Sequence, residues 1–211
     1  MAVTDGRILR VHDLVRFRAD DDTGLPPWVT REGTTVWGVV RRSPATTPGT
    51  TALGLRGPQR SERLPLEVRV HDIVEVVAPE DLAGRALEST VSPELAPSLA
   101  ILSSASSETF GGLPWGPTGS AGFELATRLP AVRATSDLDL ILRADQRLAR
   151  EDAGAILRFL RTLPCLVDCL LETPRGAVAL AEWAGPAGGS VLLRTPAGPV
   201  LTRDPWQDDA R

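Results

Sequence analysis

Two short motifs in the middle of the chain constrain its fold more than any other feature. The first is a Gly-Ser turn at Gly119 and Ser120, and the second is Asp137-Leu138-Asp139, which leads into the apolar run 140–142. Polar and apolar residues alternate from Asp137 onward, which predicts a β-strand whose successive side chains point to opposite faces. Asp137 and Asp139 then share a face, with their attachment points roughly 6.6 Å apart.

The chemistry of these two motifs is complementary. Carboxylates at the spacing of Asp137 and Asp139 can converge on a hard cation. The loop 116–120 precedes a segment, 121–127, that can form a short helix, and free N–H groups at a helix start attract phosphate oxygens. Glycine lets the backbone approach closely, and a serine hydroxyl adds a hydrogen-bond donor. Asp-x-Asp alone is also typical of a solvated edge strand, but the combination predicts a site for a metal ion and a phosphate.

A Gly-Ser loop, a spacer and Asp-x-Asp on a strand together resemble the core motif of the nucleotidyltransferase superfold. The resemblance implies an α+β fold in which a mixed sheet is flanked by helices. In the N-terminal part, the segments 35–42, 51–56 and 68–77 are rich in β-branched and apolar residues and predict strands, and a helix is expected to begin at Pro79. We therefore expect a small β-rich N-terminal domain over 1–84, for substrate or partner binding, and a nucleotidyltransferase-like catalytic domain over 85–211.

Composition excludes several classes of function. The chain has 211 residues, a net charge of -4 and a pI near 5.3, which argues against a general nucleic-acid binder. All 23 basic residues are arginine, so mechanisms that need a P-loop lysine, a kinase lysine or a Schiff base are excluded. The N-terminus has no apolar core of a signal peptide, and no stretch approaches 18 uninterrupted apolar residues. These features predict a soluble, cytoplasmic protein that does not bind membranes.

The residues most often used by hydrolases and metalloproteins form no motif here. Cys165 and Cys169 lie in an apolar run without an accompanying histidine, which predicts buried free thiols rather than a zinc site or a disulfide. Ser120 has no glycine two residues before it, as a serine-hydrolase nucleophile elbow requires. We expect the two histidines, His12 and His71, to be structural.

Five arginines follow or end the predicted N-terminal strands: Arg41, Arg42, Arg56, Arg60 and Arg63. Guanidinium groups recognise phosphates with two parallel hydrogen bonds, so a cluster of them would bind the substrate's phosphates. Exposed arginines in a chain without lysine are the alternative. We assign the phosphate-binding role to Arg41, Arg42 and Arg56 as an expectation.

A third carboxylate is expected from the segment 166–172, which is predicted to be a buried strand. An acid inside an apolar strand is costly unless a positive group meets it, so Asp168 is the candidate third metal ligand. Glu172 on the same face is an alternative ligand, and a salt bridge from Asp168 to an arginine is an alternative role. We further expect helices over 93–102 and 150–163, a loop over 103–107, a hairpin of 177–183 with 190–195, and core positions for Trp183 and Trp206.

The ordered set of motifs resembles one family over nearly the whole chain. It comprises residues 116–127, 136–140, 171–174, 182–183 and 192–195, together with His12-Asp13-Leu14 and Arg41-Arg42. This set is similar to malonate decarboxylase holo-acyl-carrier-protein synthase, also called phosphoribosyl-dephospho-CoA transferase. Arg128 stands where the pattern leads us to expect glycine after Ala126 and Thr127, which leaves the turn at this point open.

The resemblance implies transfer of a phosphoribosyl-dephospho-CoA group from its triphosphate precursor to a serine of the decarboxylase acyl carrier protein, with release of pyrophosphate. Asp137, Asp139 and Asp168 would hold Mg²⁺, or Mn²⁺, and Gly119 and Ser120 would bind the pyrophosphate end. Asp168 could also receive or orient the serine proton. Two alternatives are a nucleotidyltransferase that uses an ordinary nucleoside triphosphate, and a non-catalytic nucleotide-binding module.

Overall fold

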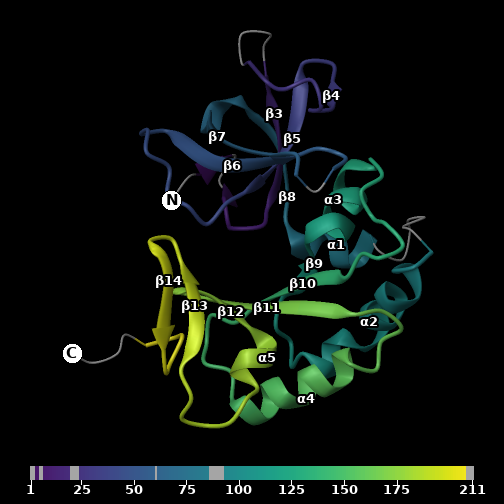
Figure 1. The fold of residues 1–211 in the computed structure, drawn as a ribbon, viewed down its shortest axis with the longest axis vertical. Coiled ribbons are helices and arrows are strands. Elements are labelled where there is room, and N and C mark those ends of the chain that lie inside the picture. The colour runs from purple at the N-terminus through teal and green to yellow at the C-terminus, as the bar shows by residue number, and fades with distance from the viewer. Residues whose placement is uncertain (1–2, 5–6, 20–23, 60, 86–92, 208–211) are drawn as a thin grey trace. The chain divides into compact units, whose positions relative to one another are not determined.

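The computed structural model describes residues 3–4, 7–19, 24–59, 61–85 and 93–207 of the chain (Figure 1). The chain divides into two compact units, Met1–Ala78 and Pro79–Arg211. The sequence interpretation placed the division after residue 84. The difference corresponds to helix α1 (Pro79–Arg85), which packs against strand β9 (Trp115–Pro117) and helix α3 (Gly119–Thr127) of the second unit.

The first unit is built around an antiparallel sheet with the strand order β7-β6-β5-β3-β8. Its strands are β3 (Leu14–Arg18), β5 (Thr35–Val40), β6 (Thr50–Arg56), β7 (Arg63–Arg69) and β8 (Ile73–Val77), with the short β4 (Arg31–Glu32) paired to β5. A separate two-stranded sheet joins β1 (Val3–Thr4) to β2 (Arg7–Ile8), and a 3₁₀ turn, η2, spans Val70–Asp72.

The predicted β-rich character of this unit is confirmed. One face of the sheet forms the core, with Val15, Phe17, Leu53 and Leu55 almost fully buried, because apolar residues recur at every second position of these strands. The loop before β6 is held by Glu67 of β7, whose carboxylate accepts hydrogen bonds from the backbone N–H and hydroxyl of Thr46, from the N–H of Thr47 and from the hydroxyl of Thr50.

The second unit contains a mixed sheet with the strand order β14-β13-β12-β11-β10-β9. Besides β9, its strands are β10 (Leu138–Arg143), β11 (Val167–Thr173), β12 (Gly176–Ala179), β13 (Val191–Thr195) and β14 (Gly198–Thr202). Strands β10 and β11 are parallel, since helix α4 (Arg150–Leu160) connects them, and the other neighbours are antiparallel. The α+β class with a mixed sheet and flanking helices is therefore confirmed.

Helices cover the two faces of this sheet differently. Figure 1 shows α1 and α3 on one side of β9 and β10, and α4 with α5 (Leu180–Trp183) on the other side. Helix α2 (Ala96–Thr109) packs against α1 and α4. Within the described residues, no helix is long and apolar enough to cross a bilayer.

Three local expectations differ from the structure. The serines 103–107, expected to form a loop, lie inside α2, where Ser103 and Ser104 donate their hydroxyls to the carbonyls of Leu99 and Ala100. Residues 180–183, expected to continue a strand, form α5, so β12 pairs with β13 only around Ala177 and Arg194. The hairpin of β13 with β14 was not predicted.

The turn after α3 forms although arginine occupies the position where glycine was expected. Arg128 caps the helix with φ 63°, in the left-handed region, and its N–H donates to the carbonyl of Glu124. The Glu124 carboxylate in turn accepts the N–H groups of Ala131 and Val132. These bonds offset the roughly 1–2 kcal/mol that a residue with a Cβ loses in this conformation.

Candidate active site

The two central strands of the second unit bring Asp139 and Asp168 side by side. Asp139 on β10 is the register partner of Asp168 on β11, so both side chains project from the same face of the sheet. Neighbouring strands lie about 4.8 Å apart. The parallel pairing, which depends on the α4 crossover, therefore creates a pair of acids that are 29 positions apart in the sequence.

The Gly-Ser motif meets Asp139 directly. The N–H of Thr118 donates to the backbone carbonyl of Asp139 at 2.8 Å, and Gly119 begins α3 with φ +57°. A Cβ on Gly119 would lie only 1.8 Å from Oδ2 of Asp139. Glycine is therefore required at this position for two reasons: its backbone is left-handed, and the Asp139 carboxylate occupies the space that a side chain would need.

The start of α3 is an electropositive element beside these acids. Gly119 and the half-buried Ser120 form its first turn, where backbone N–H groups have no helical acceptor and the helix dipole is positive. Gly122, one turn further, lets α3 approach β9, because a Cβ there would lie 2.6 Å from the carbonyl oxygen of Pro117. The sequence thus positions a helix start, of the kind that favours anions, next to a carboxylate pair.

The remaining predicted acids occupy different positions. Asp137 is exposed and lies one residue before β10 begins, two residues from Asp139 along the chain. Glu172, the alternative third acid, pairs in register with Arg143 and lies four residues beyond Asp168, about 13 Å along the strand. The register thus favours Asp168 over Glu172 as the partner of Asp139.

The expectation that Asp168 is buried is wrong. Its side chain is exposed in the second position of β11, while Cys169 beside it is buried. Alternation along the strand explains this, because successive side chains of β11 point to opposite faces of the sheet, and Cys169 and Leu171 lie on the buried face. Asp168 therefore needs no internal cation to compensate burial, and it is available to a ligand from solvent.

The donor set at this site fits a cation that the substrate helps to hold. Among the described residues, no three His, Cys, Asp or Glu side chains lie close enough together to hold an ion. Asp139 and Asp168 supply carboxylate oxygens from adjacent strands. Mg²⁺ is commonly bound by one or two carboxylates together with substrate phosphates and water. The residues present match this arrangement better than they match a preformed protein cage.

Cys169, next to Asp168, does not supply a nucleophile to this site. Cys165 and Cys169 are both free thiols. Burial, and to a lesser extent the negative charge of Asp168, raise the pKa of the Cys169 thiol well above its usual value. Cys169 therefore stays protonated at neutral pH and is not a nucleophile.

The arginines assigned to phosphate binding belong to the first unit, whereas the acids belong to the second. Arg41 follows β5, and a Cβ on Gly54 would lie 3.4 Å from its Cδ, so its stem packs over that glycine. Arg42 and Arg56 interact with neighbouring groups, Arg63 donates to the carbonyls of Gln59 and Glu62, and Arg60 lies outside the described residues. Their role in phosphate binding stays a prediction.

The opposite ends of β10 and β11 carry residues that the sequence interpretation did not single out. Arg143, whose side chain is 1% exposed, donates Nε to Glu80 of α1 at 2.8 Å. A Cβ on Gly116 of β9 would lie 1.8 Å from the carbonyl oxygen of Pro79, so α1 starts in direct contact with β9. The signal in the sequence was a charged residue, Arg143, directly after the apolar run 140–142.

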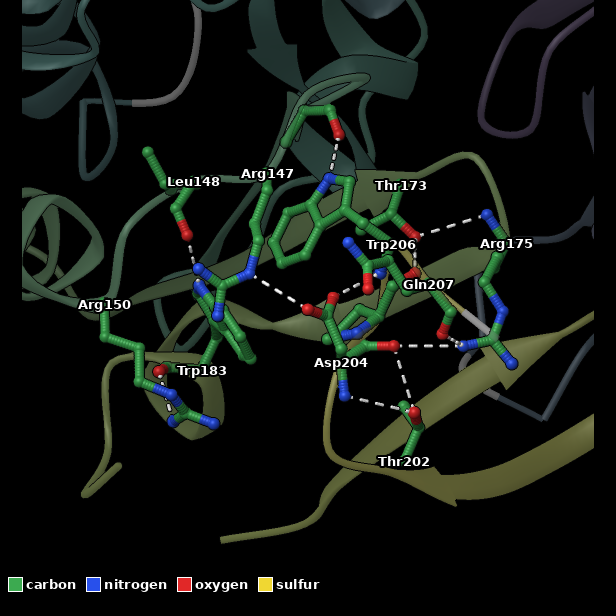
Figure 2. Close-up of polar contacts among 12 residues, drawn as sticks. Arg147, Leu148, Arg150, Thr173, Arg175, Trp183, Thr202, Asp204, Trp206 and Gln207 are labelled. Carbon is green, nitrogen blue, oxygen red and sulfur yellow. Dashed lines mark hydrogen bonds and ion pairs between the residues drawn. The ribbon is translucent and has the colours of Figure 1, made fainter. Parts of the chain in front are cut away.

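An aromatic cluster lies beyond the C-terminal end of β10 (Figure 2). Trp183 and Trp206 meet edge to face at 5.0 Å and donate their indole N–H groups to the carbonyls of Leu148 and Ala144. Arg147 stacks on Trp183 and pairs with Asp204 at 3.0 Å. Trp183 is fully buried and Trp206 partly so, as expected for residues that anchor the core.

Comparisons with known proteins give matches that cover both units of the chain. Residues 10–79 match the family described as Phosphoribosyl-dephospho-CoA transferase MdcG N-terminal domain, and residues 81–205 match the corresponding C-terminal domain. A phosphoribosyl-dephospho-CoA transferase of Azotobacter vinelandii is 41% identical over 94% of this chain and 95% of its own. Relatives of the same name are 43% identical in Pseudomonas putida, over 87% of both chains, and 37% identical in Klebsiella pneumoniae, over 93% of this chain and 96% of the relative. No solved structure gives a significant match.

Proposed function

This chain belongs to the phosphoribosyl-dephospho-CoA transferase family, and we propose that its acceptor is a serine of the malonate decarboxylase acyl carrier protein. The donor in this proposal is 2'-(5''-triphosphoribosyl)-3'-dephospho-CoA, and pyrophosphate is the second product. The observation that carries the proposal is the junction of Asp139 with Asp168 and with Gly119. It combines paired carboxylates with a helix start that favours phosphate, as transfer from a triphosphate requires.

The bonds exchanged are defined by these substrates. The serine oxygen attacks the phosphorus of the phosphate attached to the ribose, and a new P–O bond forms. The bond between this phosphorus and the bridging oxygen of the two terminal phosphates breaks, and these leave as pyrophosphate. The serine proton leaves to a base, for which Asp168 is suited because it is exposed and lies beside Asp139. Such transfer depends mainly on orientation and charge stabilisation, so the same carboxylate also holds the hydroxyl in line before it accepts the proton.

The leaving pyrophosphate is assigned to the start of α3. Gly119 allows an approach to the backbone N–H groups, and the Ser120 hydroxyl adds a donor in the same turn. Negative charge that accumulates on the leaving oxygens is stabilised by these groups. Arg41, Arg42 and Arg56 of the first unit are assigned to the substrate's remaining phosphates.

Asp139 and Asp168, with Asp137 beside them in the sequence, are the residues that would hold Mg²⁺ or Mn²⁺. The ion, when bound, supplies neutralisation of the triphosphate charge. Without such neutralisation the adjacent carboxylates would repel the donor. The acids therefore bind the donor only together with a cation, which makes donor binding dependent on the divalent ion.

The test is to incubate the protein with Mg²⁺, the triphosphoribosyl donor and the apo carrier protein, and to measure pyrophosphate together with the mass of the carrier. We expect pyrophosphate release that requires both substrates and a carrier serine that gains the prosthetic group. Modification with ordinary nucleoside triphosphates but not with this donor would instead indicate a general nucleotidyltransferase. Donor binding without pyrophosphate release would indicate a non-catalytic module.

A further inference from the structure

A row of apolar side chains crosses the second sheet next to the acids. Leu170 of β11 pairs in register with Ala179 of β12, and Leu192 of β13 pairs with Leu201 of β14. The register of Ala177 with Arg194 places Ala179 and Leu192 at the same level on β12 and β13. These four residues, Leu170, Ala179, Leu192 and Leu201, form the apolar row, and they share one face of the sheet.

The apolar row is continuous with the candidate active site. Leu170 lies two residues beyond Asp168 on the same strand and therefore on the same face. Helices α1 and α3 pack mainly against β9 and β10 on this face, and exposure rises along the row. Leu170 and Ala179 are half-buried, whereas Leu192 is 38% and Leu201 70% exposed. The row thus leads from the acids to the edge of the sheet.

We propose that the apolar row binds the pantetheine arm of the donor, which rests on the proposed function. The triphosphate and the arm are attached to different positions of the donor's adenosine, so the arm extends away from the acids while the triphosphate faces them. From β11 to β14 the row spans three strand spacings, about 14 Å. A long chain with geminal methyl groups and amides can lie across it and cover the exposed leucines.

The width of the apolar row favours a chain-like ligand over a protein partner. The row is bordered by charged side chains on β11 and β13, because the residues two positions away on this face are Glu172 and Arg194 there, with Ala177 and Pro199 at the same level on β12 and β14. A specific protein interface buries about 800 Å² on each partner, more than four side chains in a row provide. An extended arm needs only a narrow apolar strip with polar groups beside it.

The experiment measures the binding of dephospho-CoA and of ADP to the full chain by calorimetry in the presence of Mg²⁺. The two ligands differ only by the pantetheine arm, which ADP lacks. We expect Leu192→Ser and Leu201→Ser to weaken dephospho-CoA binding by about three- to tenfold and ADP binding by less than about twofold. Val200→Ser is the matched control, because Val200 is the neighbouring residue of β14, is 43% exposed and faces the other side of the sheet. It should bind both ligands as the unmodified protein does.

Several results would overturn the proposal. They are unchanged dephospho-CoA binding in both row variants, equal weakening of both ligands, or no dephospho-CoA binding by the unmodified protein. A raised KM for the carrier protein with unchanged dephospho-CoA binding would assign the row to the carrier instead. Since calorimetry needs neither acceptor nor turnover, a failure of the transfer assay leaves this result standing, and the reverse also holds.

Discussion

The two ends of strands β10 and β11 are built on opposite electrostatic principles. Where the strands end, Arg143 is buried against Glu80, and Arg147 pairs with Asp204 beside the edge-to-face pair of Trp183 and Trp206. Where they begin, two acids, Asp139 and Asp168, are register partners. Opposite charges meet at one end, and like charges meet at the other.

This difference separates the end of the two strands that stabilises the fold from the end that we propose binds the substrate. Like charges on adjacent strands cost stability. The backbone at Gly119 has φ +57°, a conformation that disfavours any residue with a Cβ. A protein keeps such an arrangement where a ligand supplies the missing charge, and we propose that a cation with the donor's phosphates does so here. Substitutions at the two ends should therefore affect different measurements.

The largest expected effect comes from Asp139→Ala. Transfer should fall by about a thousandfold or more, because the change removes a carboxylate that we propose holds the cation required by the donor. The free energy of unfolding should change far less than transfer does, since the Asp139 side chain is only half-buried. Pyrophosphate release and urea unfolding measure the two quantities, and Asp137→Ala should lose transfer in the same way.

A suitable control is Asp152→Ala, which removes an exposed acid from the first turn of α4. It should retain transfer and lose only a few tenths of a kcal/mol of stability through the helix dipole. Full transfer by both Asp137→Ala and Asp139→Ala would contradict the assignment of the metal site.

The next largest effect is expected for Gly119→Ala, which places a methyl group where Oδ2 of Asp139 lies. Transfer should fall about a hundredfold as the carboxylate is displaced. Gly111→Ala separates displacement from backbone strain, because Gly111 has φ +59° and nothing within 4 Å of its added Cβ. Both variants should lose about 1–2 kcal/mol of stability, but only Gly119→Ala should lose transfer. Equal transfer rates in the two variants would refute the steric argument.

Glu80→Gln tests the structural end of the strands. It leaves the buried guanidinium of Arg143 without its carboxylate, which should lower the free energy of unfolding by about 2 kcal/mol. The value lies below the roughly 3–5 kcal/mol typical of fully buried pairs, because the Glu80 side chain is 24% exposed. At saturating substrates transfer should change less than about twofold. A large loss of transfer at unchanged stability would place this pair in the catalytic machinery.

The smallest effect concerns Glu67 of the first unit, a carboxylate stabilised by hydrogen-bond donors. The Thr46 N–H, followed by the hydroxyls of Thr46 and Thr50, lowers the pKa of Glu67 from 4.5 to about 2. Its contribution to stability is therefore present above pH 4.5 and is lost as the pH falls toward 2. Between pH 5 and pH 2 the free energy of unfolding should fall less steeply with decreasing pH in Glu67→Gln than in the unmodified protein. Identical slopes in the two proteins would contradict the role of these bonds.

The sequence predicts the elements of the site better than their assembly. The helix after Gly119, the strand after Asp137 and the strand around Asp168 all follow from local residue patterns, and all three are present. Alternation alone placed Asp137 and Asp139 on one face, but the pairing of Asp139 with Asp168 depends on the register of two parallel strands. That register is set by packing, which no local pattern encodes.

The wrong expectations have the same origin. An apolar neighbourhood suggested that Asp168 is buried, although one face of β11 is open. Serines suggested a loop at 103–107, although their hydroxyls bond to carbonyls within α2. The partner of Arg143, Glu80, lies 63 residues away in the chain, so only the fold identifies the pair.

The most direct test of the central claim, that Asp139 and Asp168 form one site, is a double-mutant cycle in the transfer assay. Asp139→Asn, Asp168→Asn and the double variant are compared with the unmodified protein at the same Mg²⁺ concentration. We predict that the double variant transfers no more slowly than the slower single variant, because residues that act as a unit give non-additive losses. Losses that multiply, or full transfer by Asp168→Asn, would show that the register pair is not the catalytic centre.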